Sequence, residues 1–217
     1  MIEAARARHA ACSLGASVDH GTLASMFDLA LLAPERLRPL RVREYDRLVD
    51  AGVFGDEHVE LLGGVLVTMS PQGEPHVVTT ARIVTLLIRQ LSDAWLVTSH
   101  SPLRVRDDSK PEPDVTVRRP VLQARQPRPA ALVVEVSDSS LTKDREIKRH
   151  FYAAAKIPEY WLVDLRRRRV EVRTRPQGQD YARLRIAERG DVLRPVALRG
   201  VTVAIADFLP AVRRRRG

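Results

Sequence analysis

The chain has 217 residues, of which 44% are hydrophobic and 29% charged, so its composition excludes a wholly disordered protein and fits one globular domain with short appendages. Its single cysteine, Cys12, excludes an internal disulfide framework and any zinc or iron–sulfur site that needs several cysteines. No apolar run approaches the roughly 20 residues of a membrane-spanning helix. We therefore expect a soluble protein without a membrane partner, from a reducing compartment such as the cytoplasm.

Arginine dominates the charge of the chain. Lys and Arg together number 36 against 27 Asp and Glu, which gives a formal net charge of +9. Only four of these cations are lysines, so 32 are arginines. A positive chain favours polyanionic partners, because neutralised phosphates release counterions. An arginine bias in genome composition explains the same charge, so charge alone does not identify a nucleic-acid partner.

The two ends of the chain are expected to lie outside the folded domain. Residues 1–33 show weak periodicity and few bulky apolar side chains, so we interpret residues 1–40 as an arm that is disordered or loosely docked. Met26 is a second possible translation start. Residues 211–217 form a basic tail, which leaves residues 41–210 as the folded domain.

Hydrophobic periodicity predicts the elements of that domain in chain order. A helix begins at Val42 and stops near Gly52, and two short strands joined by Gly63-Gly64 follow as a hairpin. The next helix runs from His76 to Leu91, with a buried face of Val77, Ala81, Val84, Leu87, Ile88 and Leu91. Four strands are then predicted at Leu96–Thr98, Leu103–Arg106, Val115–Arg118 and Ala131–Val136.

The second half of the domain is predicted to contain one helix, one strand and a C-terminal group of hairpins. A helix is expected from about Thr142 to Lys156, ending before Pro158, and the segment YWLVDL follows as a strand. The segments RVEVRT, DYARLRIA and VTVAI predict a hairpin-rich C-terminal extension of the sheet. This order of elements indicates an α/β fold with helices around one mixed sheet.

Glu135 is the most informative residue, because it interrupts the apolar run AALVVEV. Such a run predicts a strand buried on both faces, where a carboxylate is costly unless it is paired or binds a metal. Asp114 enters the preceding strand 21 residues earlier, and successive strands are usually neighbours. Two adjacent carboxylates repel each other, and a hard divalent ion such as Mg²⁺ or Mn²⁺ relieves that repulsion. The alternative makes Asp114 a turn residue and Glu135 half of a buried ion pair, for example with an arginine.

The helix predicted after Glu135 has an apolar row and a polar row of side chains on adjacent faces. Ile147, Phe151 and Ala154 are expected to face the core. Asp144, Lys148 and Tyr152 follow one another at every fourth position and form a polar stripe beside them. Lys148 is therefore placed to lean toward the two acids, although an ordinary Asp144–Lys148 surface pair fits the same spacing.

These residues resemble a known pattern. The likeness rests on the strings PEPDV and LVVEVSDSSLTKDREIKRHFYAAAKIPEYWLVDL, which are similar to those of the Uma-type family of restriction endonucleases in the PD-(D/E)xK nuclease superfamily. It also includes REYDRLVDAGVFGDEHVELLGGVLVTMSP and His76, and it extends from about Arg41 to Pro210. The resemblance implies a restriction-endonuclease-like core of one helix, three strands, a second helix and a fourth strand.

The resemblance also implies roles for particular residues. Asp114 matches the acid of the "PD" pair, and Glu135 matches the acid of the third core strand. Ser137 stands where the motif lysine usually lies, and Lys148 on the following helix matches a displaced lysine. Glu60 matches an upstream acidic position that completes the site.

The implied chemistry is metal-assisted hydrolysis of a phosphodiester. Asp114, Glu135 and the carbonyl of Val136 would hold Mg²⁺ or Mn²⁺, which neutralises the phosphate and activates a water. Lys148 would orient or help to deprotonate that water and stabilise the pentavalent transition state. Glu60 would hold a metal-bound water or a second ion. Alternatively, Glu60 is an ordinary solvated acid at the edge of the hairpin, with no role in the site.

Weaker candidates complete the set of site residues. The candidate substrate contacts are His76, Ser137 and Tyr152. His76 is equally consistent with a solvated histidine at the start of a helix, and Tyr152 with a side chain packed under its helix. The tryptophans and the tyrosine expected in the core are Trp95, Tyr160 and Trp161. The arginine runs that either bind phosphates or are solvated are Arg166–Arg169 and Arg213–Arg216.

Three functions follow from this reading. The leading one is a Mg²⁺-dependent endonuclease that hydrolyses phosphodiester bonds of DNA. The alternatives are a non-cleaving nucleic-acid-binding module on a nuclease scaffold and a metal-dependent hydrolase of another phosphate ester. A homodimer is expected for an enzyme that cuts both strands, because symmetry supplies two identical sites.

Overall fold

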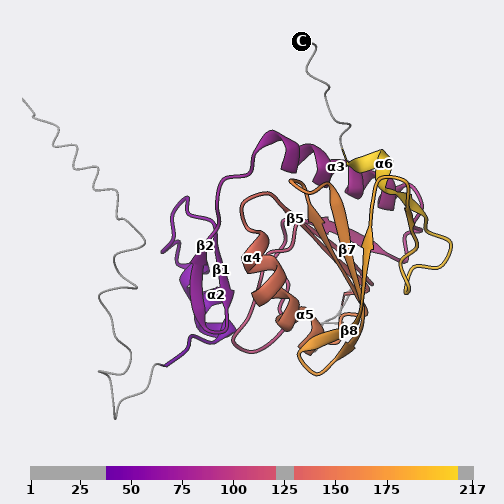
Figure 1. Cartoon of the computed structure of the whole chain (residues 1–217). Coiled ribbons are helices and arrows are strands. Elements are labelled where there is room, and N and C mark those ends of the chain that lie inside the picture. Colours follow the sequence, from indigo (N-terminus) through magenta and orange to yellow (C-terminus); the bar gives the residue numbers. More distant parts are fainter. Residues whose placement is uncertain (1–37, 121–129, 210–217) are drawn as a thin grey trace, which may run out of the picture. The chain divides into compact units, whose positions relative to one another are not determined.

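The computed structural model describes residues 38–120 and 130–209 (Figure 1), and all of them except Arg38 belong to a compact unit that begins at Pro39. Most of the predicted N-terminal arm, including Cys12 and Met26, lies outside the described residues. The predicted basic tail with Arg213–Arg216 also lies outside them. Within the described ranges, none of the helices combines the length and the apolar character needed to cross a bilayer.

The first elements agree with the sequence prediction. Helix α2 spans Val42–Asp50, and strands β1 (Val59–Leu62) and β2 (Val65–Thr68) pair as an antiparallel hairpin. Gly63 and Gly64 connect them with φ angles of +60° and +81°. Two successive positive φ angles are the requirement of a tight turn that matches strand twist, which glycine meets without strain.

Helix α3 spans Glu74–Ile88, and its buried face differs from the predicted one. The inward side chains are His76, Thr79, Thr80, Ile83 and Leu87. Of the predicted face, Leu87 is buried, and Val84 and Leu91 are partly buried against the core. Val77 and Ile88 are 50% and 55% exposed, and Ala81 is exposed as well. The prediction was therefore only partly right: apolar residues occur around much of this helix, and in its first turn the buried residue is His76, which lines a polar cavity rather than the apolar core.

Six strands form the main sheet in the order β3-β4-β5-β6-β7-β8. Their bounds are Leu96–Ser99, Val115–Arg118, Leu132–Ser137, Glu159–Asp164, Arg169–Gln177 and Asp180–Ala187. Among the described strands of this sheet, β5 and β6 are the one parallel pair. A parallel pair needs a crossover, which the helical segments α4 (Leu141–Lys143), η2 (Asp144–Lys148) and α5 (Arg149–Ala154) supply. The predicted mixed sheet, core order and hairpin extension are therefore confirmed.

Two predicted strands are absent from that sheet. Residues 103–106 form no ladder in the described chain, because the segment folds back so that the Leu103 N–H donates to the carbonyl of Pro111. The segment VTVAI contributes β10 (Val203–Ala204), which pairs with β9 (Val192–Leu193) in a separate two-stranded sheet. The chain then turns into α6 (Ile205–Phe208), whose apolar side chains pack into the core instead of extending the main sheet.

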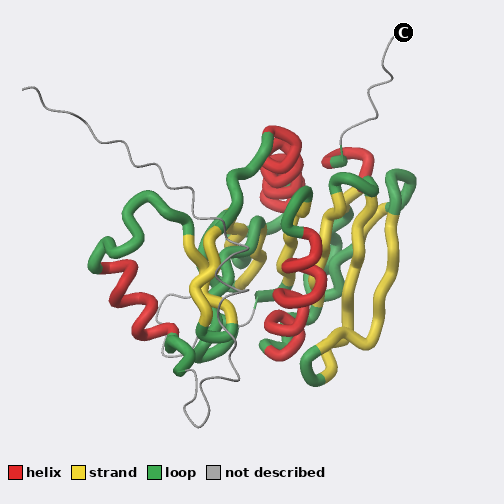
Figure 2. The backbone as a smooth tube through the Cα atoms, turned by 60° about the vertical axis from the view of Figure 1, so that its left-hand side comes forward, coloured by secondary structure: helices red, strands yellow, loops and turns green. Residues whose placement is uncertain are grey.

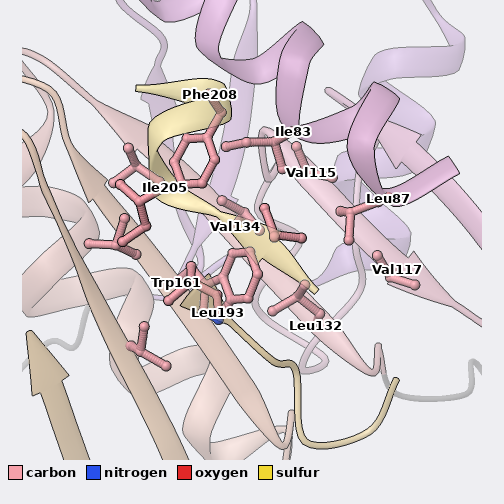
Figure 3. Packing of buried hydrophobic residues seen from close by; sticks show 14 of the residues in the cluster. Ile83, Leu87, Val115, Val117, Leu132, Val134, Trp161, Leu193, Ile205 and Phe208 are labelled. Atoms are coloured by element: carbon pink, nitrogen blue, oxygen red, sulfur yellow. The ribbon is translucent and has the colours of Figure 1, made fainter. Parts of the chain in front are cut away.

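Helices cover both faces of the main sheet (Figures 1 and 2). On one face α3 and α6 pack on the larger core, where Ile83, Phe208, Val134 and Trp161 meet (Figure 3). On the other face α5 packs Tyr152 and Ala153 against Val133, Tyr160 and Leu162. Because side chains alternate along a strand, Val134 of β5 faces α3 and the next residue, Glu135, faces the crossover helix.

Candidate active site

Asp114 and Glu135 meet where β4 and β5 pair. Val115 is the partner of Val134, and the same antiparallel register, continued by one residue, places Asp114 opposite Glu135. Both side chains are buried. The backbone N–H of Val136 donates to Oδ2 of Asp114 at 2.7 Å, which fixes that carboxylate. The predicted adjacency of the two acids follows directly from this pairing.

Glu135 is paired as well as buried. Lys148 Nζ lies 3.0 Å from Oε1 of Glu135, and the Tyr152 hydroxyl donates to the same oxygen at 2.5 Å. Burial raises the pKa of Glu135 well above its ordinary value, and Lys148 only partly opposes that rise. The buried ion pair considered from the sequence is therefore present, with a lysine in place of an arginine.

Lys148 is the central cation of the site. Its Nζ lies 3.0 Å from Glu60 Oε2, 3.0 Å from Glu135 Oε1 and 3.8 Å from Asp144 Oδ1. Burial alone lowers the pKa of Lys148, but these carboxylates outweigh burial and raise it above its ordinary value. Lys148 therefore stays protonated and acts as a donor and a fixed charge.

The orientation of the crossover helix differs from the prediction. Asp144, Lys148 and Tyr152 are buried, whereas Ile147, expected to face the core, is 46% exposed. The Asp144–Lys148 pair is thus a buried contact and not the surface pair that the spacing also allowed. The acids beneath the helix explain the reversal, because they satisfy a buried lysine that an apolar core would not.

Glu60 is fully buried on β1, which excludes the solvated hairpin-edge role. Lys143 Nζ lies 2.7 Å from its Oε1, Lys148 contacts its Oε2, and the Glu112 N–H donates to Oε2 at 3.2 Å. Burial by itself raises the pKa of Glu60, but the two lysines outweigh it and lower the pKa below its ordinary value. Glu60 is therefore an anion that holds two lysines.

A second set of side chains surrounds the other oxygen of Asp114. His76 Nε2, His100 Nδ1 and Gln72 Nε2 lie 3.2, 3.4 and 3.4 Å from Oδ1. His76 is buried rather than solvated. Sequence reasoning missed His100 and Gln72, since both lie in loops without periodicity and reach Asp114 only through the tertiary fold.

Asp114, Glu135 and Lys148 open onto one cavity of about 290 Å³, which residues 68–73 bound on one side. Its acidic lining residues are Glu112, Asp114, Glu135, Asp138 and Asp144. Lys143, Lys148 and His76 also line it. An excess of carboxylates in one concave site attracts cations and repels a bare phosphate.

The remaining predicted residues take different places. Val136 lines the cavity, whereas Ser137 is buried with its hydroxyl 3.2 Å from that of Ser140, a lining residue. Tyr152 is fully buried, and its hydroxyl donates a hydrogen bond to Glu135 rather than facing the cavity as a substrate contact. Arg166 in the β6–β7 turn pairs with Asp138 at 2.9 Å.

Two of the three aromatic residues expected in the core are fully buried, and the third is not. Tyr160 and Trp161 are fully buried, as expected. Trp95 is only partly buried, and the guanidinium of Arg119 lies 4.0 Å from the centre of its ring.

The donor set fits a hard divalent cation. Asp114, Glu135 and Val136 line the same acidic cavity and offer carboxylate and carbonyl oxygens, the ligands that Mg²⁺ and Mn²⁺ prefer. Among the residues that the structure describes, no three or more His, Cys, Asp or Glu side chains are arranged to hold a metal. The predicted set has only two carboxylates and one backbone carbonyl, so bound waters would complete the coordination shell.

Comparison with solved structures gives a fold match. The chain is similar to the crystal structure of a "putative nuclease belonging to DUF820" from Anabaena variabilis, with 16% sequence identity and a TM-score of 0.63. The alignment covers 79% of this chain and 98% of that one. At this identity the likeness establishes the shared fold.

Comparison with family models extends this to sequence. The model of the Uma2 family, described as "putative restriction endonuclease", matches residues 42–206. No curated protein matches the chain. Because the matched region takes in both the paired acids and the crossover helix with Lys148, and spans most of the chain, this protein belongs to the Uma2 family.

Proposed function

We propose that this protein is a divalent-metal-dependent endonuclease that hydrolyses phosphodiester bonds of DNA. The observation that carries the proposal is the pair of buried acids, Asp114 and Glu135, facing an acidic cavity together with Lys148. Membership of a family described as restriction endonucleases supports a nuclease activity. The fold shared with a protein described as a nuclease supports it as well.

Asp114, Glu135 and the Val136 carbonyl would hold the metal ion. When bound, a divalent ion neutralises charge on the phosphate and lowers the pKa of a bound water. The protein orients these ligands beforehand: the Val136 N–H and His76 fix the two oxygens of Asp114, and Tyr152 and Lys148 fix Glu135. Such preorganisation is what a charge-stabilising site requires.

Lys148 supplies a positive charge beside the reacting phosphate. Because Glu60 and Glu135 keep it protonated, it donates a hydrogen bond to the attacking water and stabilises the charge that develops on the phosphate. This role needs no proton transfer to Lys148. Glu60 is assigned to the positioning of Lys148 and not to the metal, because it pairs with Lys143 and Lys148 and, unlike Asp114 and Glu135, is not among the residues that line the cavity.

Plasmid nicking with Mg²⁺ or Mn²⁺ tests the function. We expect the wild-type protein to cleave, and D114N and E135Q each to lose activity by roughly 10²-fold or more. E188Q removes the same charge from an exposed glutamate and is expected to cleave like the wild type. Thermal unfolding of all four proteins shows whether each variant is folded at the assay temperature, so that a lost cleavage in a folded variant is a loss of chemistry.

Other outcomes separate the alternatives. Equal cleavage by wild type and E135Q contradicts the site assignment. Metal-independent, salt-sensitive DNA binding without cleavage supports a binding module, and cleavage of other phosphate esters alone supports a different hydrolase. We also propose a homodimer, which sedimentation of the wild-type protein tests directly.

A further inference from the structure

The helix that crosses from β5 to β6 contains a π-helical turn at the site. Residues Asp144–Lys148 form this turn, and the Arg149 N–H donates to the carbonyl of Asp144, five residues earlier. The helix is α-helical on both sides of it. Single π turns of this kind often occur at functional sites.

The π turn explains how two lysines reach one carboxylate. Along an α-helix each residue is rotated by about 100° from the previous one, so residues five apart face different directions. A π turn closes between residues five apart and therefore aligns them. Lys143 and Lys148 are five residues apart, and they contact Oε1 and Oε2 of Glu60 at 2.7 and 3.0 Å.

The two lysines differ in access to the cavity. The side chain of Lys148 is 3% exposed and is enclosed by Glu60, Glu135 and Asp144. The side chain of Lys143 is 23% exposed and lines the same cavity. Lys143 is held at one oxygen of Glu60, so its ammonium keeps donors for a further partner.

The cavity wall needs such a cation. Five acidic residues line it, and Lys143 and Lys148 are the lysine or arginine residues among its described lining residues. A nucleic-acid strand carries a phosphate at every nucleotide, and each phosphate that enters an acidic cavity is repelled unless a cation meets it. Lys148 is too enclosed to meet a second phosphate.

We propose that Lys143 is a substrate-binding residue that contacts a backbone phosphate of the nucleic-acid strand in this cavity. Glu60 and the π turn hold it there in register with Lys148, so that one carboxylate places both cations. Lys143 is not among the site residues predicted from the sequence. This inference rests on the proposed nuclease function, because it names a contact with the substrate of the same site.

The salt dependence of DNA binding tests the contact. A labelled DNA duplex is titrated with the full-length E135Q protein, which keeps the DNA intact, in Mg²⁺ and a series of salt concentrations. Adding K143Q should reduce the slope of log Kd against log salt concentration by about one, the effect of losing one phosphate contact. K143R keeps the charge and should keep the slope. K156Q removes an exposed lysine beyond the same helix and should leave the slope unchanged.

The outcomes distinguish this inference from the proposed function. If K143Q and K156Q have the same slope while the E135Q protein binds DNA, the role of Lys143 is wrong and the nuclease proposal stands. A K143Q protein that is only less stable, with an unchanged slope, also overturns the contact, because Lys143 then serves Glu60 alone. If the E135Q protein shows no salt-dependent binding to DNA, both proposals fail.

Discussion

At the scale of single residues, the site consists of buried carboxylates that share one buried lysine. Lys148 is the shared counter-ion of Glu60, Glu135 and Asp144, all four of which are buried. A buried ion pair adds little net stability compared with apolar groups, but the removal of one partner leaves an uncompensated charge. The same network that prepares the chemistry is therefore sensitive to any change of charge.

The first prediction concerns Lys148. K148M should lower the free energy of unfolding by about 3–5 kcal/mol, because it leaves three buried carboxylates without their shared cation. Urea unfolding of the wild type and the variant measures the loss. In the double variant E135Q/K148M one of those charges is neutral, so part of the stability should return. Strictly additive losses in the double variant would contradict the coupling.

At the scale of elements, the β1–β2 hairpin carries Glu60 to the site from a distant part of the sequence. The Leu40 N–H donates to the Gly64 carbonyl at 3.0 Å, and the Gly64 N–H donates to the Asp108 carbonyl at 2.7 Å. Gly64 is therefore held between two other segments. A side chain at Gly64 would place its Cβ only 2.2 Å from the Cβ of Pro39.

The second prediction compares two glycines in hairpin turns. Gly64 and Gly178 both have positive φ angles, but an added Cβ at Gly178 meets no atom within 4 Å. G178A should cost only the roughly 1–2 kcal/mol of the left-handed conformation, whereas G64A adds a clash with Pro39. Thermal unfolding should show the larger loss in G64A. Equal losses would mean that Pro39 moves away without cost.

At the scale of the whole folded domain, charged contacts join the crossover helix to the sheet. Arg145 in the π turn donates to Oε1 of Glu171 on β7 at 2.6 and 2.9 Å, and Arg173 donates to Oε2 at 2.8 Å. Burial by itself raises the pKa of Glu171, but the two arginines outweigh it and lower the pKa below its ordinary value of 4.5.

The third prediction follows from that lowered pKa. Because the folded state favours the carboxylate, Glu171 stabilises the protein above its ordinary pKa, and this contribution disappears as the pH falls through the lowered value. E171Q should cost on the order of 1–3 kcal/mol at neutral pH, with the difference shrinking in acid. Urea unfolding at several pH values measures it, with E188Q as the exposed control. A difference that stays constant in acid would exclude this contribution.

Local patterns were enough for the order of most elements and for the paired acids. The Gly63-Gly64 turn, the apolar run of β5 and the nearness of successive strands are properties of short segments, so the sequence predicts them. Glu135 was identifiable from the sequence because a carboxylate within an apolar, buried strand is costly unless it is paired or binds a metal. Asp114 followed from the strand next to it.

The long-range contacts were decided by the tertiary structure. Lys143 and Glu60 are 83 residues apart, and no local period connects them. The buried face of the crossover helix depends on the acids beneath it and on a π turn, so an apolar stripe with Ile147 predicted the wrong side. The sequence by itself determined the order of most elements and that two acids meet, but it also predicted a strand at residues 103–106 that the described chain lacks. Lys148 and His76 were candidates from the sequence, whereas only the fold decided that His100 and Gln72 reach Asp114 and that Lys143 reaches Glu60, because those contacts join segments that are distant along the chain.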